Sequence, residues 1–269
     1  MNNHDTTPFL RLFALVIGNF SAPCGLRRII VALAYGITCH VLFAIAVLSM
    51  IVVMYSGMTA AFGRVPHPWS WGLNLLLVLQ FPVGHSILLS RLGRSALLLL
   101  ASTENANILQ TTLFAIVASV QLCLLFLFWS PSGIIWWVAE GYVKWIMTGL
   151  YTSAWLLLIK ASYDAGAEVQ SGALGWMSML QKIAPKYPNM PVLGLFAIIR
   201  QPIYLSFALT LWTVPVWTPD QLLVSTLLTA YCITAPRFKE KRFAARYGED
   251  FQDYRAQTPY MLPCIQKTK

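Results

Sequence analysis

The sequence predicts an all-α polytopic membrane protein with about six transmembrane helices, a C-terminal helical hairpin and a cytosolic tail. Of its 269 residues, 57% are hydrophobic and only 11% are charged, whereas soluble domains usually carry about 25% charged residues. Several apolar runs approach the roughly 20 residues that a helix needs to cross the hydrocarbon core of a bilayer. Lysine and arginine concentrate in alternate connecting segments, which is the pattern that orients membrane helices.

Six apolar segments account for the predicted spans. Pro82 lies inside the second segment and is expected to kink it, because proline leaves a backbone carbonyl without its helical partner. Pro215 and Pro219 bracket the connection between the last two segments, so these two should form a helical hairpin. The segments are 29–55, 69–89, 109–129, 143–159, 202–216 and 219–235.

The chain divides into four predicted parts, and the basic residues orient them. With the N-terminus inside, the outer segments contain only Arg64 and Lys144, so both termini are expected in the cytoplasm. No internal repeat is visible, which argues against a transporter. The parts are a cytoplasmic N-terminal segment with a candidate interfacial helix (1–28), a four-helix membrane core (29–162), a cytoplasmic loop (163–199), and a membrane hairpin with its tail (200–269).

The formal charge of +9 would suggest nucleic acid in a soluble protein. Here the basic residues serve to orient the helices, so we expect no nucleic-acid partner. The five cysteines are scattered without a Cys-x-x-Cys pair or a Cys/His cluster. We therefore expect neither a disulfide framework nor a metal site.

Polar residues with a definite spacing gather in the C-terminal third. Taken singly, each has a plain structural explanation: Arg200 would anchor a helix end at the headgroups, and Glu240 would belong to a solvated charged face. Their common order and spacing favour a shared site instead. In chain order they are Arg200, Gln201, Pro202 and Tyr204, then Lys239 and Glu240, then Tyr247 and Gly248, and finally Tyr254 and Thr258-Pro259.

This order resembles the C-terminal signature of the isoprenylcysteine carboxyl methyltransferase superfamily, over roughly residues 195–263. That signature is Arg-His-Pro-x-Tyr, a hydrophobic hairpin, a Glu-Glu pair, an aromatic-Gly pair, a Tyr and a final Val/Thr-Pro. Within it the chain most resembles the bacterial methanethiol S-methyltransferase group, including His85 and Arg91 after the second span. Gln201 stands where the family has His, and Lys239 where it has the first Glu. Gln cannot titrate near neutral pH.

The resemblance implies an S-adenosyl-L-methionine-dependent methyltransferase in the bacterial inner membrane. Arg200 suits the cofactor's carboxylate, and Glu240 suits its hydroxyls or ammonium. His85, at the inner end of the second span, is a candidate base that ionises a thiol, and Arg200 is the second candidate catalytic residue. The expected acceptor is a small apolar thiol such as methanethiol, or another lipophilic molecule that enters from membrane lipid. The implied cofactor-binding residues are Arg200, Gln201, Pro202, Tyr204, Glu240, Tyr247, Gly248 and Tyr254.

Three other functions are compatible with these residues. A prenylcysteine or a lipid would also fit an apolar acceptor pocket. NADPH-dependent membrane steroid or sterol reductases have a similar C-terminal layout, but the Gly-Glu pair of those enzymes does not follow Tyr204 here. A non-catalytic membrane accessory protein agrees with the departures at Gln201 and Lys239. Titration of purified protein with each cofactor separates these alternatives.

Overall fold

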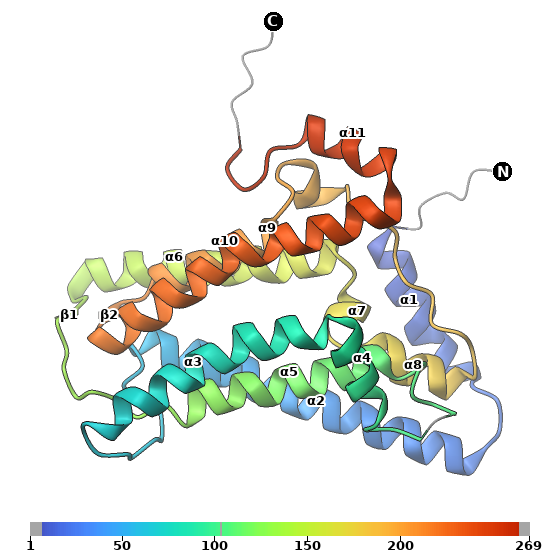
Figure 1. Ribbon diagram of the computed structural model, residues 1–269, viewed down its shortest axis with the longest axis horizontal. Coiled ribbons are helices and arrows are strands. Elements are labelled where there is room, and N and C mark those ends of the chain that lie inside the picture. Colours follow the sequence, from blue (N-terminus) through green and yellow to red (C-terminus); the bar gives the residue numbers. More distant parts are fainter. Residues whose placement is uncertain (1–6, 103, 264–269) are drawn as a thin grey trace, which may run out of the picture.

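A computed structural model describes residues 7–102 and 104–263 of the chain, so Cys264 and the outermost residues of the first and last predicted parts lie outside the description. The described chain is a bundle of helices with one short two-stranded sheet (Figure 1). Its elements are α1 (Pro8–Gly18), η1 (Asn19–Ser21), α2 (Leu26–Tyr55), α3 (Trp69–Leu88), α4 (Arg91–Leu98), α5 (Gln110–Leu127), β1 (Trp137–Val138), α6 (Gly141–Asp164), α7 (Ala167–Gln170), α8 (Ala173–Gln181), η2 (Gly194–Ala197), α9 (Pro202–Trp212), β2 (Val216–Trp217), α10 (Pro219–Tyr247) and α11 (Glu249–Gln257).

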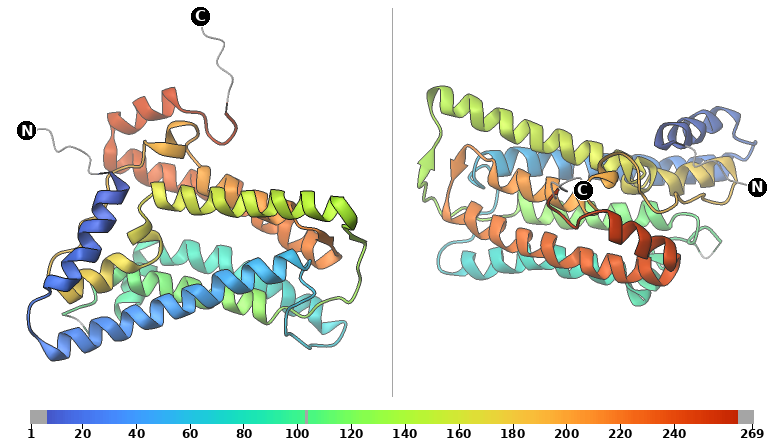
Figure 2. Two further views of the ribbon diagram at one scale, coloured as in Figure 1. Left: turned by 180° about the vertical axis from the view of Figure 1, so that it is seen from behind. Right: turned by 90° about the horizontal axis from the view of Figure 1, so that it is seen from above.

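The long helices run along one common axis. Seen from the front and from above, α2, α3, α5, α6 and α10 lie lengthwise beside one another (Figures 1 and 2). The start of α2, the whole of α4 and the end of α10 lie at one end of the bundle, and β1 and β2 lie at the opposite end. Helix α2 packs mainly on α5, and α9 packs between α6 and α10. This arrangement suits a protein whose helices alternate in direction across a membrane.

Three of the helices are long and apolar enough to cross a membrane. They are α2, α3 and α5, and they match the first three predicted segments. Helix α6 and the first part of α10 contain the fourth and sixth predicted segments, and α9 covers the first eleven residues of the fifth. The description of the chain as a helical membrane protein therefore agrees with the structure, while the total of about six spans stays a prediction.

The two helices of the predicted hairpin, α9 and α10, differ in length from their predicted segments. Helix α9 ends at Trp212, because Val216 and Trp217 pair in an antiparallel strand with Trp137 and Val138. Helix α10 continues twelve residues past the predicted segment, from Pro236 to Tyr247. Lys, Arg, Glu and Ala dominate that extension, and these residues favour helix. The charged tail therefore begins as a continuation of the hairpin helix, which places Glu240 on the same helix as the last predicted membrane segment.

The start of α10 is fixed by strong local signals. The Thr218 hydroxyl accepts a hydrogen bond from the Gln221 backbone N–H at 3.0 Å, and Pro219 occupies the first turn. A hydroxyl at this capping position and a proline in the first turn are both favoured at helix starts. The same Thr218 hydroxyl donates to the Gly57 carbonyl at 2.7 Å. This contact joins the hairpin to the end of α2.

The exterior of the bundle is strongly apolar. Ile37 on α2, Leu76 on α3 and Trp145 on α6 are all more than 60% exposed. Contiguous exposed apolar surface of this extent is costly in water and normal in a lipid solvent. The interior core gathers Met54, Trp129 and other side chains from α2, α3, α5, α6, α9 and α10. The bundle therefore buries one apolar core while leaving a second apolar surface for lipid.

At the end of the bundle that also holds α4, helices α1 and α8 pack together. Gln181 at the end of α8 donates to the Leu15 carbonyl at 2.7 Å, and Arg11 forms an ion pair with the buried Glu168 at 3.1 Å. Helix α1 exposes Phe9 and Phe13, as an interfacial helix would. His40, which lies within the first predicted span, accepts a hydrogen bond from the Trp176 indole at 3.0 Å. His40 is thus a contact between α2 and α8.

A substitution of Asp220 tests whether this buried carboxylate stabilises the start of the hairpin helix α10. It is 1% exposed and accepts hydrogen bonds from the Trp129 indole N–H at 3.0 Å and from the Ser132 backbone N–H at 2.9 Å. Asp220→Ala leaves these buried donors unpaired, so we expect a loss of about 3 kcal/mol in the free energy of unfolding. Denaturant unfolding in detergent measures this loss. Asp250→Ala, at an exposed site on α11, is the control, and equal effects of the two substitutions would contradict the assignment.

Candidate active site

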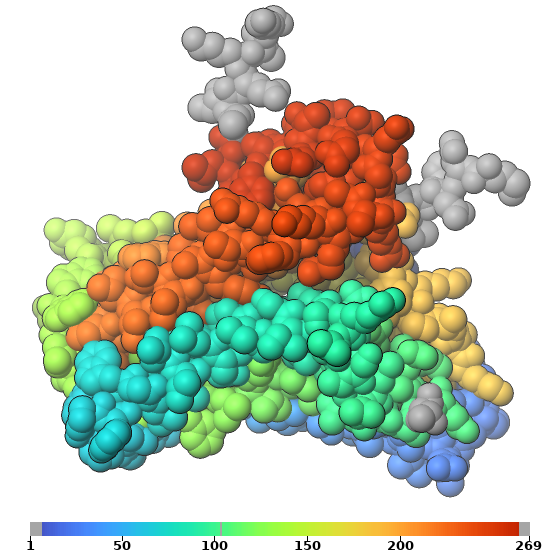
Figure 3. Space-filling view, in the orientation of Figure 1, coloured from blue at the N-terminus to red at the C-terminus, as the bar shows by residue number. Residues whose placement is uncertain are grey.

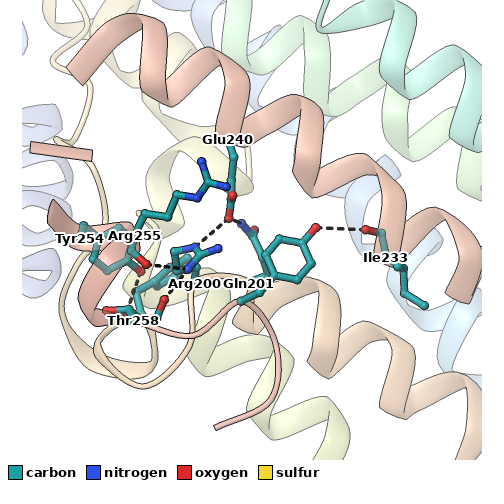
Figure 4. Close-up of polar contacts among 9 residues, drawn as sticks. Arg200, Gln201, Ile233, Glu240, Tyr254, Arg255 and Thr258 are labelled. Carbon is teal, nitrogen blue, oxygen red and sulfur yellow. Dashed lines mark hydrogen bonds and ion pairs between the residues drawn. The ribbon is translucent and has the colours of Figure 1, made fainter. Parts of the chain in front are cut away.

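Glu240 is the centre of a polar cluster at the end of α10. Its Oε1 accepts a hydrogen bond from the Arg200 Nε at 2.9 Å and another from the Gln201 amide at 2.8 Å (Figure 4). The side chains of Arg200 and Glu240 are only 10% and 13% exposed. A charge-assisted pair with so little solvent is stronger than a surface pair. Glu240 therefore contacts Gln201, which lies 39 positions before it, and Arg200, which lies 40 positions before it, as their shared motif predicted.

The chain after α11 folds back onto this cluster. The Arg200 Nη1 donates to the carbonyls of Arg255, at 3.1 Å, and of Thr258. The backbone N–H groups of Arg200 and Gln201 donate to the carbonyls of Pro259 and Tyr260, at 2.9 and 3.1 Å. We call Arg200, Gln201, Glu240, Tyr254 and residues 258–260 the Arg200 cluster. It joins the start of α9, the end of α10 and the tail into one unit.

Tyr254 belongs to the same unit. Its hydroxyl donates to the Phe196 carbonyl at 2.7 Å, and its own carbonyl accepts from the Thr258 N–H at 3.0 Å. Burial raises the pKa of Tyr254 to about 12, so its hydroxyl keeps its proton at neutral pH. Tyr254 thus holds α11 against η2, rather than presenting a free hydroxyl.

Three polar atoms of the Arg200 cluster have no hydrogen-bond partner among the described residues. The Arg200 Nη2 and the Glu240 Oε2 form no hydrogen bond with the described residues. The Gln201 Oε1 is buried and also lacks a partner there. Buried polar atoms are normally paired, so an orphan of this kind marks either strain or a missing ligand. One cation, one carboxylate oxygen and one amide oxygen suit a carboxylate, an ammonium and a hydroxyl.

Other residues predicted for the site lie outside this cluster. Tyr247 packs its ring against Phe243, with centroids 5.5 Å apart, and Gly248 makes the turn between α10 and α11 at φ +53°. A positive φ suits glycine, which has no Cβ, and a Cβ added at Gly248 would have no atom within 4 Å. Pro202 is buried at the first turn of α9. In this structure these three shape the backbone around the cluster, and a cofactor contact for them stays a prediction.

A cavity lies on the opposite face of α10 from Glu240. Its volume is about 690 Å³, which is in the range of small-molecule sites. It follows the seam between α10 and the α3–α4 region, which faces the viewer in Figure 3. We call it the arginine-lined cavity. Its walls are Ser86, Leu89, Ser90, Arg91, Arg94, Ser95, Leu98, Asn107, Gln110, Tyr204, Tyr231, Ala235, Phe238 and Arg242.

The cavity contains one predicted site residue and several that were not predicted. Tyr204 was predicted, whereas Tyr231, Phe238 and Arg242 were not assigned to the site. The sequence does contain a pattern that could have identified them. Intervals of four, three and four residues separate Tyr231, Ala235, Phe238 and Arg242. That spacing places them on one face of a helix. The motif residue Glu240 lies on the other face of α10 and is not among the lining residues.

His85 does not line the cavity, although its neighbour Ser86 does. Its ring packs between Phe81 and Phe114, with centroids 5.2 and 5.0 Å away, and its Nδ1 is buried without a partner among the described residues. The structure therefore places His85 in the contact between α3 and α5. A role for it as general base stays a prediction. No group of three or more described His, Cys, Asp and Glu side chains could hold a metal ion.

Comparison with known proteins identifies the relatives of the chain. It is 26% identical to methanethiol S-methyltransferase 2 of Bradyrhizobium diazoefficiens over 191 residues, which cover 71% of this chain and 72% of that protein. It is 24% identical to methanethiol S-methyltransferase of a Pseudomonas species, over 60% of this chain and 62% of that protein. The chain is similar to the methanethiol S-methyltransferases. The predicted resemblance to this group is confirmed.

A further relative has a name that states no reaction. Nurim of Xenopus laevis is 23% identical over 204 residues, which cover 68% of this chain and 69% of that protein. No model of a protein family matches the chain, and no solved structure matches it significantly. The similarity therefore rests on the amino-acid sequences of these relatives.

Lys239, which stands where the superfamily has a Glu, provides a test of the local electrostatics. Its ammonium lies 5.4 Å from the Phe196 ring centroid and 5.2 Å from that of Phe243. Burial lowers the pKa of Lys239 to about 8, with Glu240 opposing this and Arg242 adding to it. Between pH 8 and 10.5 the unfolded chain therefore binds more protons than the folded protein, so stability rises with pH through this window.

Lys239→Met should remove this penalty. We expect the thermal midpoint at pH 7 to rise by about 3 °C, the shift that about 1 kcal/mol produces in a protein of this size. The gain in stability of the parent protein between pH 7 and pH 9.5 should shrink by a similar amount. Thermal unfolding in detergent at both pH values measures this, with the exposed Lys241→Met as control. A lower midpoint for Lys239→Met at pH 7 would show that the ammonium stabilises the fold.

Proposed function

We propose that this protein is an integral-membrane methyltransferase that uses S-adenosyl-L-methionine and methylates a small thiol. The observation that supports this best is the meeting of Arg200, Gln201 and Glu240, within 2.9 Å, at a helix whose other face lines a cavity with Tyr204. Arg200 and Glu240 are among the residues through which the chain resembles a methyltransferase superfamily, and Gln201 occupies the position of its His. The names of the bacterial relatives support a thiol as acceptor.

The residues of this region fit the parts of the cofactor. In the proposed site, Arg200 binds the carboxylate through Nη2, while Glu240 and Gln201 accept hydrogen bonds from an ammonium or ribose hydroxyl through Oε2 and Oε1. Glu240 holds the Arg200 and Gln201 side chains in place through its other oxygen. Tyr204 and Tyr231 provide ring faces for an apolar or aromatic group. When bound, the cofactor supplies an electrophilic methyl group on a sulfonium.

In the proposed reaction, the protein positions the two reactants and excludes water, and it forms no covalent bond with either. Attack of a thiolate on a sulfonium methyl removes two opposite charges, so the reaction is favoured where water is scarce. The apolar parts of the cavity, Leu89, Leu98 and Phe238, provide such surroundings. Holding the two reactants in contact supplies a large share of the rate on its own.

Glu240→Gln tests the proposed cofactor site. The substitution keeps the shape of the side chain but removes the charge that Arg200 and Gln201 contact. We expect the dissociation constant for S-adenosyl-L-methionine to rise at least about tenfold, because hydrogen bonds to a charged group contribute about 1.5–3 kcal/mol. Methyl transfer to thiols should fall at least as much. Equilibrium dialysis with labelled cofactor and a thiol methylation assay measure the two effects.

The matched control is Glu249→Gln, because Glu249 is an exposed carboxylate at the start of α11. It should leave both cofactor binding and methyl transfer within about twofold of the parent. Unchanged cofactor binding in Glu240→Gln would remove Glu240 from the site. Binding of NADPH in place of S-adenosyl-L-methionine by the parent protein would favour the reductase alternative.

A further inference from the structure

The arginine-lined cavity is cationic without compensation. Arg91, Arg94 and Arg242 contribute guanidinium groups from α4 and α10, and no Asp or Glu is among the lining residues. Among the described residues, none of these three arginines forms an ion pair with a carboxylate. Glu240, the nearest acid on α10, is engaged with Arg200 on the other face of that helix. Three positive charges therefore border one cavity.

This charge does not suit the cofactor alone. S-adenosyl-L-methionine carries a sulfonium, an ammonium and one carboxylate at neutral pH, so its net charge is positive. Like charges that share one site repel one another. A second, negative ligand next to the sulfonium would neutralise part of this charge. A neutral thiol such as methanethiol supplies no such charge until it ionises.

The rest of the lining indicates an organic anion. Tyr204, Tyr231 and Phe238 form an aromatic wall, and Leu89 and Leu98 extend it. Arginine binds carboxylate and phosphate through parallel hydrogen bonds from its planar group. A ligand with an acidic end and a short apolar body matches a cavity lined by both guanidinium groups and aromatic rings.

We propose that the arginine-lined cavity binds the methyl acceptor as an organic anion, a thiol that carries an acidic group such as a short mercaptocarboxylate. This inference rests on the proposed methyltransferase function and names its substrate class. In the reaction, a bond forms between the acceptor sulfur and the methyl carbon. The bond between that carbon and the cofactor sulfur breaks, and its electron pair stays on the cofactor sulfur. The thiol proton is released to water before the attack.

The same arginines provide a way to ionise the thiol. The lining contains no His, Asp, Glu, Cys or Lys, so no residue that usually accepts a proton near neutral pH is in place. A nearby cation favours the charged form of an acid and lowers its pKa. Arg242 and Arg94 thus hold the acidic group of the acceptor and favour its thiolate, without a separate general base.

The experiment compares two thiols of equal length with the full chain in nanodiscs of phosphatidylcholine. The probes are 3-mercaptopropionate and neutral 1-propanethiol, each with labelled S-adenosyl-L-methionine. We expect kcat/KM to favour 3-mercaptopropionate by at least about tenfold, as expected for a hydrogen-bonded charged group. Arg94→Gln and Arg242→Gln should each lower that ratio about tenfold. Lysine at either position should restore part of it, because the charge remains.

A binding measurement without turnover completes the design. Calorimetry should show 3-mercaptopropionate binding to the parent protein in the absence of cofactor, weakened by added salt and by Arg242→Gln. Arg27→Gln is the matched control, because Arg27 is an exposed arginine at the start of α2, outside the cavity. It should leave both the binding and the kcat/KM ratio as in the parent.

The outcomes separate the two proposals. Equal kcat/KM for the two thiols, or a ratio that Arg94→Gln and Arg242→Gln leave unchanged, overturns the anionic acceptor and leaves the methyltransferase standing. Absence of both cofactor binding and methyl transfer to any thiol overturns the proposed function itself. If the arginine substitutions instead weaken only the binding of phosphatidylglycerol vesicles, the arginines serve lipid headgroups and the inference is wrong.

Discussion

The ion pair between Arg200 and Glu240 determines how the C-terminal third is organised. Glu240 sits on the extension of α10, and Arg200 immediately precedes α9. The Arg200 guanidinium and the two backbone N–H groups beside it also fix the chain after α11. A partly buried carboxylate without these donors would be strongly disfavoured. One side chain therefore couples the hairpin, the tail and the turn that precedes the hairpin.

Arg200 and Gln201 both donate to the Oε1 of Glu240. The Oε2 therefore has no partner among the described residues, and these two contacts fix its direction. The same is true of Gln201, whose amide N–H group is paired while its buried oxygen is not. Histidine at this position would titrate near neutral pH, whereas glutamine donates to Glu240 at every physiological pH. Gln201 therefore provides a hydrogen bond to Glu240 that does not depend on pH in this range. The departure at Lys239 is different in kind, because it places a half-buried cation near the rings of Phe196 and Phe243.

The fold was predictable where hydropathy alone decides it. Helices α2, α3 and α5 begin and end within three residues of their predicted segments, because a long apolar run in lipid has few alternatives to helix. The strand pairing of Trp137 with Trp217 was not predictable, because it joins two residues 80 positions apart in short connections. The length of α10 was also missed, since hydropathy reports where the apolar part stops rather than where the helix does.

The candidate site was predictable as a set of residues but not as an arrangement. Order and spacing predicted that Arg200, Gln201 and Glu240 act together, and in the structure they are in contact. The same reasoning treated Tyr204 as one of their companions, whereas Tyr204 faces a cavity on the other side of α10. Which face of a helix a motif residue occupies depends on the neighbouring helices, and a linear signature does not carry that information. The positions on α10 that face α3 and α4 carry Tyr231 and Arg242, so the helix that holds Glu240 also gives the cavity its charge.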